Sequence, residues 1–231
     1  LAEKTIAKGI AVFGNISDDI SNKVREQYEK NPYPRWLTPI RLKGTSIADF
    51  CDNAKLKLYS KNIKDVSSPK ILVAGCGTGQ HSLETATHFS GCHVTAVDLS
   101  LTSLAYAKRK TIEANLTNLE YVHADILNLA NLGKEFDIIE SVGVLHHMSE
   151  PMTGWSILTK LLKPGGLMRI GLYSELARQD IVRTRNEIKL LGVETSEFEM
   201  RKFRQTMIAS SKESHQRLTK SDDFFSLSTL R

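Results

Sequence analysis

The twelve residues ILVAGCGTGQHS, from Ile71 to Ser82, decide how this sequence folds. The apolar run at 71–74 shows no polar alternation, which is typical of a strand buried on both faces of a parallel sheet. Glycines then follow at alternate positions, Gly75, Gly77 and Gly79. Glycine adopts positive φ and leaves the main chain bare. The stretch therefore predicts a strand that runs into a loop whose backbone contacts a ligand.

Strand and helix patterns alternate on the carboxyl side of this loop. The predicted strands cover 71–74, 93–97, 119–124, 136–142 and 167–172. The predicted links are helices over 82–89, 101–114 and 151–162, with a short turn at 127–132. Ser100 is placed to cap the second of these helices, and 164–166, Pro-Gly-Gly, predicts a tight turn into the last strand. Ahead of the first strand, 47–58 has a helical pattern. Strands that alternate with helices form a parallel sheet with helices on both faces. We expect an α/β, doubly wound, Rossmann-like fold, with strand order 3-2-1-4-5 when these strands are numbered along the chain.

Composition limits the classes of protein that remain. With 231 residues and 41% hydrophobic content, the chain has room for one full domain and an appendage. The net charge of +5 is spread among charges of both signs, which is weak evidence for a nucleic-acid partner. Cys51, Cys76 and Cys92 form no CxxC pair, and an odd number argues against a disulfide framework. We predict a cytoplasmic protein without a membrane span or secretory signal.

A carboxylate ends the second predicted strand, about 20 residues after the glycine loop, where a ribose-binding acid belongs in this class of fold. This residue is Asp98, in the stretch HVTAVDLS. Ligands of a doubly wound sheet bind at the carboxyl ends of its central strands, next to a helix N-terminus. Gln80 stands where a dinucleotide fingerprint would have its last glycine, so the pattern is GxGxG. These features favour a nucleoside ligand over a dinucleotide.

Five stretches resemble the motifs of the class I S-adenosylmethionine-dependent methyltransferases in order and approximate spacing. They are ILVAGCGTGQ, VTAVDLS, YVHADILNL, FDIIESVGVLHHM and LLKPGG, and the resemblance covers 71–173. QYEKNPYPRW, ahead of the glycine loop, resembles the methyltransferase domains that often follow tetratricopeptide repeats in bacterial proteins. The resemblance implies S-adenosylmethionine as methyl donor and S-adenosylhomocysteine as product.

The resemblance also implies a division of the chain. Residues 1–68 would be an N-terminal helical extension or lid, and 69–174 the cofactor-binding methyltransferase core. Residues 175–231 would be a helical segment that caps the substrate. We find no final pair of antiparallel strands in this last part and expect the chain to be truncated before them. Since it begins at Leu1 and not at a methionine, we expect a piece of a longer protein. The last strand would then lie at a sheet edge, which favours a homodimer.

Carried over by position, the resemblance implies a cofactor site. The glycine loop would hold the methionine part, Asp98 the ribose, Leu99 one face of the adenine, and Asp125 with Ile126 its edge. The full predicted set is Gly75, Cys76, Gly77, Gly79, Gln80, Asp98, Leu99, Asp125, Ile126, Val142, Tyr28 and Arg35. The family usually has an acid two positions before the first glycine, and this sequence has Val73 there. We expect backbone carbonyls of Ala74 or Val142 to take its role.

Two histidines follow the fourth predicted strand, where the transferred methyl group would point. Methyl transfer from a sulfonium requires alignment and exclusion of water rather than a nucleophilic side chain. His147, and after it His146, are candidates for the base that accepts the acceptor's proton, since imidazole titrates at about pH 6.5. The alternative is that both pack within their loop. Adjacent histidines with no Cys or carboxylate at zinc-ligand spacing predict no metal site.

The segment NPYPRW has two possible structural interpretations. Tyr28, Tyr33, Arg35 and Trp36 offer aromatic faces and a guanidinium suited to a lid over the cofactor. The alternative is a strap that packs its aromatic side chains on the domain.

The methyl acceptor has no signature of its own. SVGVLHHM lacks the (D/N/S)PP(Y/F) tetrad of DNA amino-methylating enzymes, so a small molecule or a protein is favoured over DNA. The arginines and lysines of 178–204 bind phosphate or form a solvated helix face. Two other functions stay open: a cofactor-binding interaction or regulatory domain without activity, and a nicotinamide dehydrogenase, which the GxGxG spacing opposes.

Overall fold

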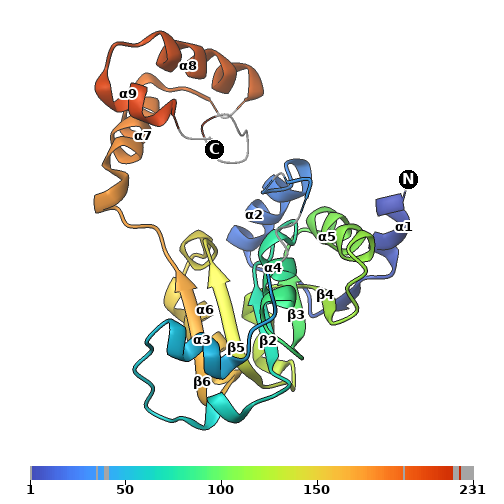
Figure 1. Ribbon diagram of the computed structural model, residues 1–231. Helices are drawn as coiled ribbons and strands as arrows, with labels where there is room; N and C mark the ends of the chain where they lie inside the picture. The colour runs from blue at the N-terminus through green and yellow to red at the C-terminus, as the bar shows by residue number, and fades with distance from the viewer. Residues whose placement is uncertain (1, 35, 39–41, 195, 221–223, 225–231) are drawn as a thin grey trace. The chain divides into compact units, whose positions relative to one another are not determined.

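The computed structural model describes residues 2–34, 36–38, 42–194, 196–220 and 224. The chain divides into two compact units, 1–172 and 173–231 (Figure 1). The first holds the sheet and the second is helical. Arg35, one of the predicted site residues, lies outside the described residues.

The sheet of the first unit is parallel throughout the described residues. Its order is β1-β4-β3-β2-β5-β6. The strands are β1 (Ala11–Phe13), β2 (Lys70–Ala74), β3 (His93–Asp98), β4 (Leu119–Ala124), β5 (Phe136–Val142) and β6 (Leu162–Gly171). The five predicted strands are β2 to β6, and the predicted order 3-2-1-4-5 is confirmed. β1 was not predicted, because it has only three residues and two of them are exposed.

Helices cover both faces of this sheet. The helices α3 (Ile47–Asn53), α4 (Gln80–His88) and α5 (Leu101–Glu113) contribute to one apolar layer, with Val73 and Ala96 from the strands. α6 (Pro151–Lys160) and the 3-10 helix η2 (Ile126–Asn131) contribute to the other. β2 contributes side chains to both layers, and residues 71–74 are at most 1% exposed. The run at 71–74 is therefore apolar because the strand is buried on both faces, as the sequence predicted.

Two predicted boundaries differ from the structure. The helix that begins at Ile47 ends at Asn53 rather than near 58. The last strand begins at Leu162 rather than 167, because the predicted turn at 164–166 lies inside β6. There the register shifts from the pair Phe136 and Leu162 to the pair Ile138 and Leu167. The turn residues therefore form an irregularity in a strand instead of its beginning.

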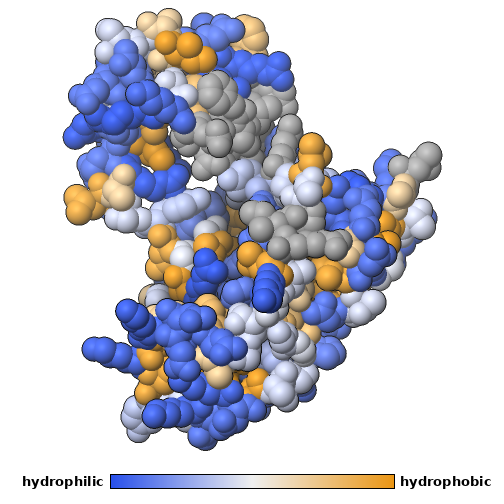
Figure 2. Space-filling model, viewed as in Figure 1, coloured by the Kyte–Doolittle hydropathy of each residue, from blue (hydrophilic) through white to orange (hydrophobic). Residues whose placement is uncertain are grey.

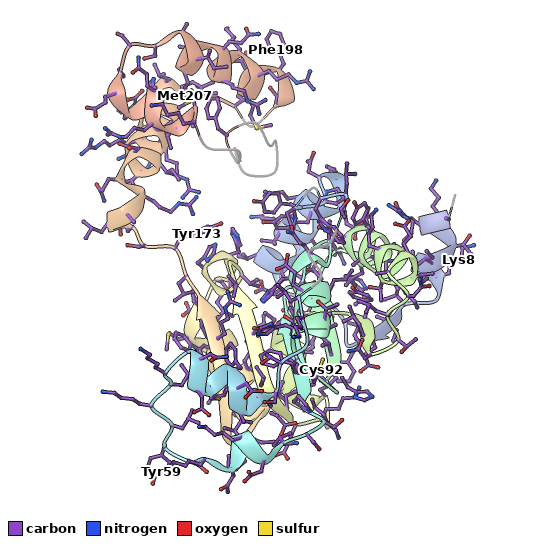
Figure 3. All side chains as sticks on the ribbon, in the orientation of Figure 1. Lys8, Tyr59, Cys92, Tyr173, Phe198 and Met207 are labelled. Carbon is purple, nitrogen blue, oxygen red and sulfur yellow. The ribbon has the colours of Figure 1, made fainter. Side chains whose placement is uncertain are left out.

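The N-terminal region packs beside α5. α1 (Ala2–Lys8) and α2 (Asp19–Lys30) both contact that helix (Figure 1). Asp18 caps α2 by accepting from the Ser21 N–H at 2.8 Å. Arg109 of α5 donates to Glu3 of α1 at 2.8 Å. The 3-10 helix η1 (Asn62–Asp65) lies in the connection from α3 to β2, next to the exposed Tyr59 (Figure 3).

The second unit consists of short helices around a small core. It contains η4 (Leu176–Arg178), α7 (Gln179–Leu191), α8 (Glu197–Ala209) and α9 (Glu213–Leu218), and its described residues include no strand. Phe203, Met207 and Phe224 form the core, and Met207 is labelled in Figure 3. Two bonds from the Arg217 guanidinium to Asp180, at 2.6 and 2.8 Å, join α9 to α7. Much of the surface of these helices is hydrophilic in Figure 2.

Candidate active site

Four neighbouring strands end at one edge of the sheet, and the predicted site residues follow them. The strands β4, β3, β2 and β5 are adjacent and parallel, so their carboxyl ends lie side by side. Their last residues are Ala124, Asp98, Ala74 and Val142. β2 is the point where the chain order reverses, with β3 on one side and β5 on the other. Such a switch point is where ligands bind in this architecture.

The glycine loop takes a conformation that other residues rarely adopt. Gly75, Gly77 and Gly79 have φ of 80, 52 and 85°, and Gly79 is the N-cap of α4. A Cβ on Gly75 would lie 2.4 Å from Val144, and one on Gly77 would lie 2.5 Å from the Tyr33 carbonyl oxygen. A Cβ on Gly79 would lie 2.5 Å from that of Ala107. Each glycine therefore lets the loop approach another part of the protein closely, besides keeping its backbone bare.

Asp98 joins the end of β3 to the glycine loop. Its Oδ2 accepts from the Gly77 N–H at 2.7 Å, and its Oδ1 accepts from the Ser100 N–H at 2.8 Å. Burial raises the pKa of Asp98, although these two N–H groups and nearby His123 act in the opposite direction. Each carboxylate oxygen keeps a second lone pair. The arrangement suits a pair of ligand hydroxyls.

The loops after β3 and β4 form the neighbouring part of the site. The carbonyl oxygen of Leu99 lies 2.9 Å from His123 Nε2. Asp125 is buried and accepts from the Leu127 N–H at 2.9 Å, so its carboxylate caps η2. Ile126 is buried at the start of that helix. One Asp125 oxygen is thus already bonded within the protein.

The segment NPYPRW lies directly on the glycine loop. The Thr78 N–H donates to the Tyr33 carbonyl at 3.2 Å, and the Thr78 hydroxyl donates to the Pro34 carbonyl at 2.5 Å. The buried Trp36 indole N–H points back to the Thr78 hydroxyl and carbonyl, at 3.1 and 3.2 Å. Tyr106 of α5 donates to the Trp36 carbonyl. The segment is therefore bonded to the loop and to α5.

The loop after β5 holds both predicted histidines. Val142 ends the strand with its side chain 41% exposed. The 3-10 helix η3 (Leu145–His147) follows, and the ring centroids of His146 and His147 are 4.2 Å apart. The ring of Tyr28, from α2, meets His147 edge to face at 6.4 Å. Residues 28 and 147, far apart in the sequence, thus lie together.

Of the remaining predicted residues, Cys76 lies within the glycine loop and Gln80 directly follows it. Burial raises the pKa of the Cys76 thiol well above its usual range, so this thiol stays protonated and is a poor nucleophile. Gln80 is the first residue of α4, and its amide donates to Glu84 at 3.3 Å. Within the described ranges, no cluster of three His, Cys, Asp or Glu side chains is arranged to hold a metal ion.

Several residues that position the site were not predicted. Glu29 of α2 accepts from the Leu101 N–H at 2.5 Å and from Thr102, so it caps α5 next to Asp98. Thr78 ties the glycine loop to the proline segment, and Glu140 is a buried acid on β5 beside α4. The sequence signal for Glu140 was an acid that follows two isoleucines in the predicted strand 136–142.

Comparisons with known proteins agree with this fold. Residues 71–166 match the family described as "Methyltransferase domain". An uncharacterized protein of Synechococcus sp. is 29% identical over 78% of this chain and 43% of its own length. A demethylmenaquinone methyltransferase of Clavibacter sepedonicus is 33% identical over 50% of this chain and 45% of its own length. A ubiquinone biosynthesis O-methyltransferase of Cereibacter sphaeroides is 32% identical over 46% and 44%.

One solved structure supports the fold over a larger part of the chain. PKMT2 from Rickettsia typhi, in complex with AdoHcy, superposes with a TM-score of 0.56 at 23% identity, over 76% of this chain and 34% of that protein. The chain spans less than half the length of these relatives. The fold is the Rossmann-like fold of methyltransferases. No helix in the described part of the chain is long and apolar enough to cross a membrane.

Proposed function

We propose that this protein, whose residues 71–166 match the methyltransferase domain family, binds S-adenosylmethionine and transfers its methyl group to an acceptor. The observation that carries the proposal is the Asp98 carboxylate at the switch point of the sheet. It is held by the N–H groups of Gly77 and Ser100, and each oxygen keeps a lone pair for a ribose hydroxyl. These residues therefore fit an adenosyl ligand.

The other predicted residues extend from Asp98 on both sides. Toward β4, Leu99 and Ile126 offer apolar faces for the adenine, and the free oxygen lone pairs of Asp125 suit its amino group. Toward β5, Gly75, Cys76 and Gly79 with Gln80 would line the methionine part, together with Val142. This order follows the order of the strands, β4-β3-β2-β5. Tyr28 and Arg35 would close the site from the N-terminal region.

The loop after β5 would face the acceptor. S-adenosylmethionine supplies a methyl group activated by its sulfonium. The residues of the chain align the acceptor with this group and exclude water. His147 is exposed, and its ring lies in edge contact with that of Tyr28. We assign His147 as the base that takes the acceptor's proton, with His146 supporting it through their ring contact.

For the acceptor we propose a small molecule or a protein rather than DNA. One relative is named as a demethylmenaquinone methyltransferase and another as a ubiquinone biosynthesis O-methyltransferase, but both alignments cover less than half of each relative. The matched part contains the core that binds the cofactor in this proposal. Acceptor pockets on such folds come from the surrounding segments. We propose that residues 1–68 form the lid and 175–231 the substrate cap.

The whole protein would be cytoplasmic and would carry tetratricopeptide repeats beside this domain. β6 is the last strand in the order of the described sheet, and the edge of a sheet can pair with a second copy. We propose a homodimer, and light scattering of the purified chain tests it: a monodisperse monomer contradicts it.

Isothermal titration calorimetry with S-adenosylhomocysteine and with NAD tests the proposed cofactor. We expect binding of S-adenosylhomocysteine and no heat from NAD. The reverse result would favour a dehydrogenase. A cofactor-binding domain without activity remains the second candidate, because Val73 replaces the acid usual in the family. A methyl-transfer assay with the full-length protein separates it from an active enzyme.

A further inference from the structure

Glu140 is a buried acid that the function proposed above does not use. Glu140 is 5% exposed and lies on β5, in register with Val73 of β2. Paired residues of neighbouring strands point to the same face of a sheet. Val73 packs in the apolar layer that includes α4, and Thr85 of α4 bonds Glu140. Glu140 therefore places a charge in the layer between the sheet and α4.

One oxygen of this carboxylate has a hydrogen bond from one side chain and an ion-pair contact with another. The Thr85 hydroxyl donates to Oε2 at 2.6 Å, and His81 Nε2 lies 3.1 Å from the same atom. Oε1 faces the Arg169 guanidinium at 3.6 Å, which is longer than a hydrogen bond, and the Arg169 side chain is 67% exposed. Oε1 thus keeps the capacity to accept from a further donor.

The charge of Glu140 is favoured by its neighbours. Burial by itself would raise the pKa of Glu140, but the hydrogen bond and charge of His81, with Thr85 and Arg169, outweigh it. The pKa of Glu140 is therefore lowered from its usual value, and the group is ionised at neutral pH. A buried carboxylate in this state attracts a cation or a strong donor.

The position of Glu140 relates it to the glycine loop. Glu140 precedes the end of β5 by two residues, and its register partner Val73 precedes Gly75 by two. His81 belongs to the first turn of α4, directly after the loop. The other buried acids in the described residues have different tasks, since Asp125 caps η2 and Asp137 bonds Lys163 at the start of β5.

We propose that Glu140, oriented by Thr85 and His81, recognises the ammonium group at the amino-acid end of the cofactor. The inference rests on the proposed function, which puts the ribose on Asp98 and the methionine part at the glycine loop. Of the two backbone carbonyls expected for this role, that of Ala74 already accepts from the Ser141 hydroxyl at 3.1 Å. Glu140 adds what a carbonyl lacks, a full negative charge opposite the ammonium.

A comparison of two ligands that share the adenosine part tests the role of Glu140 in binding the ammonium group. S-adenosylhomocysteine carries the ammonium, whereas 5′-deoxy-5′-methylthioadenosine keeps the adenosine and thioether without the amino-acid end. For Glu140→Gln we expect S-adenosylhomocysteine to bind about tenfold to a hundredfold more weakly, because a charged hydrogen bond is lost. Binding of methylthioadenosine should change by less than about twofold, because it makes no such bond. Isothermal titration calorimetry measures both.

Two further variants control this comparison. Asp137→Asn neutralises a buried acid at the other end of the same strand and should leave the affinity ratio of the two ligands unchanged. Val73→Asp, added to Glu140→Gln, returns a carboxylate on the neighbouring strand at the same level of the sheet. We expect it to restore part of the affinity for S-adenosylhomocysteine.

The outcomes separate this inference from the proposed function. An equal loss for both ligands in Glu140→Gln, or unchanged binding of S-adenosylhomocysteine, overturns the role of Glu140 alone. If the unaltered protein binds neither ligand, the proposed function fails as well. Should Glu140→Gln not fold, His81→Gln keeps the carboxylate but disturbs its orientation, and a selective loss for S-adenosylhomocysteine is again expected. An equal loss there also contradicts the proposal.

Discussion

The two ends of the sheet hold their carboxylates in different ways. At the amino end, Asp137 accepts from the Lys163 ammonium at 2.7 Å and from the Lys70 N–H at 2.8 Å. The ion pair joins β5 to β6, and the hydrogen bond from the Lys70 backbone joins β5 to β2. At the carboxyl end, Asp98 is held by main-chain N–H groups of two loops. The first acid is matched by a protein cation, while the second keeps acceptor capacity for a ligand.

The difference follows from parallel topology. All strands begin at one end of the sheet and finish at the other, where glycine turns and helix N-termini present N–H groups. A carboxylate at that end accepts hydrogen bonds from backbone N–H groups, and each of its oxygens keeps a lone pair for a further donor. Burial raises the pKa of Asp98, which shows that withdrawal from water outweighs its stabilising contacts. An acid that costs stability at neutral pH is a sign of a binding site.

Replacement of each acid should give the largest contrast. We expect Asp98→Ala to weaken binding of S-adenosylhomocysteine by about a hundredfold or more, because two charged hydrogen bonds to the ribose are lost. Asp137→Ala should leave that affinity nearly unchanged but lower the free energy of unfolding by about 2 kcal/mol, since a buried N–H and Lys163 lose their acceptor. Calorimetric titration and urea denaturation measure the two effects. Equal losses of stability in both variants would contradict the contrast between the two ends.

Gly77→Ala should disturb the carboxyl end through its backbone. Alanine at positive φ is disfavoured by about 1 kcal/mol, and its Cβ would lie 2.5 Å from the Tyr33 carbonyl oxygen. Gly133→Ala is the matched control, because Gly133 also has positive φ, 65°, but a Cβ there meets nothing within 4 Å. We expect Gly77→Ala to cost about 2 kcal/mol more unfolding free energy than the control, since packed backbone must shift. Chemical denaturation checks this difference, and equal costs would rule out a close contact between loop and proline segment.

The pH dependence of stability sharpens the comparison further. The folded pKa of Glu140 is lowered, so its charge stabilises the folded state above the unfolded pKa of about 4.5. This contribution is lost as the pH falls through the folded pKa. We expect Glu140→Gln to be less stable than the unaltered protein by about 1 kcal/mol at pH 7, with the gap closing as the pH falls through the lowered folded pKa of Glu140. Urea denaturation at several pH values measures it. Asp98 should show the opposite trend, since its folded pKa is raised and its stabilising contribution is lost as the pH rises.

Trp36→Phe should have the smallest effect. The change keeps a buried aromatic ring but removes the indole N–H that points to Thr78. We expect a loss of about 1 kcal/mol in unfolding free energy, the usual contribution of one buried hydrogen bond. Affinity for S-adenosylhomocysteine should fall only slightly. We expect limited proteolysis to cut the variant within 31–38 faster than the unaltered protein, because the segment loses a hydrogen bond to the glycine loop. An unchanged rate of digestion would show that this bond does not hold the segment on the loop.

Much of the fold could be predicted from local pattern. The run at 71–74 is apolar because β2 is buried on both faces, and Ser100 caps α5 as expected by accepting from the Ser103 N–H at 3.1 Å. β1 could not be predicted, because it has only three residues, two of them exposed, and these leave no periodic signal. The turn at 164–166 was also misplaced, because pairing with β5 continues on both sides of it.

The candidate site also has a part that the sequence predicts and a part that only the tertiary structure shows. The sequence by itself determined that Gly75, Asp98, Asp125 and Val142 stand at the carboxyl ends of four strands of a parallel sheet, since strand ends and turn residues are local features. Only the tertiary structure decided that Tyr28 meets His147, that Thr78 holds the proline segment, and that Glu140 faces Thr85 across the sheet and helix layers. These contacts join residues 44 to 119 positions apart in the chain. Their geometry depends on how whole elements pack, which no short stretch of sequence encodes.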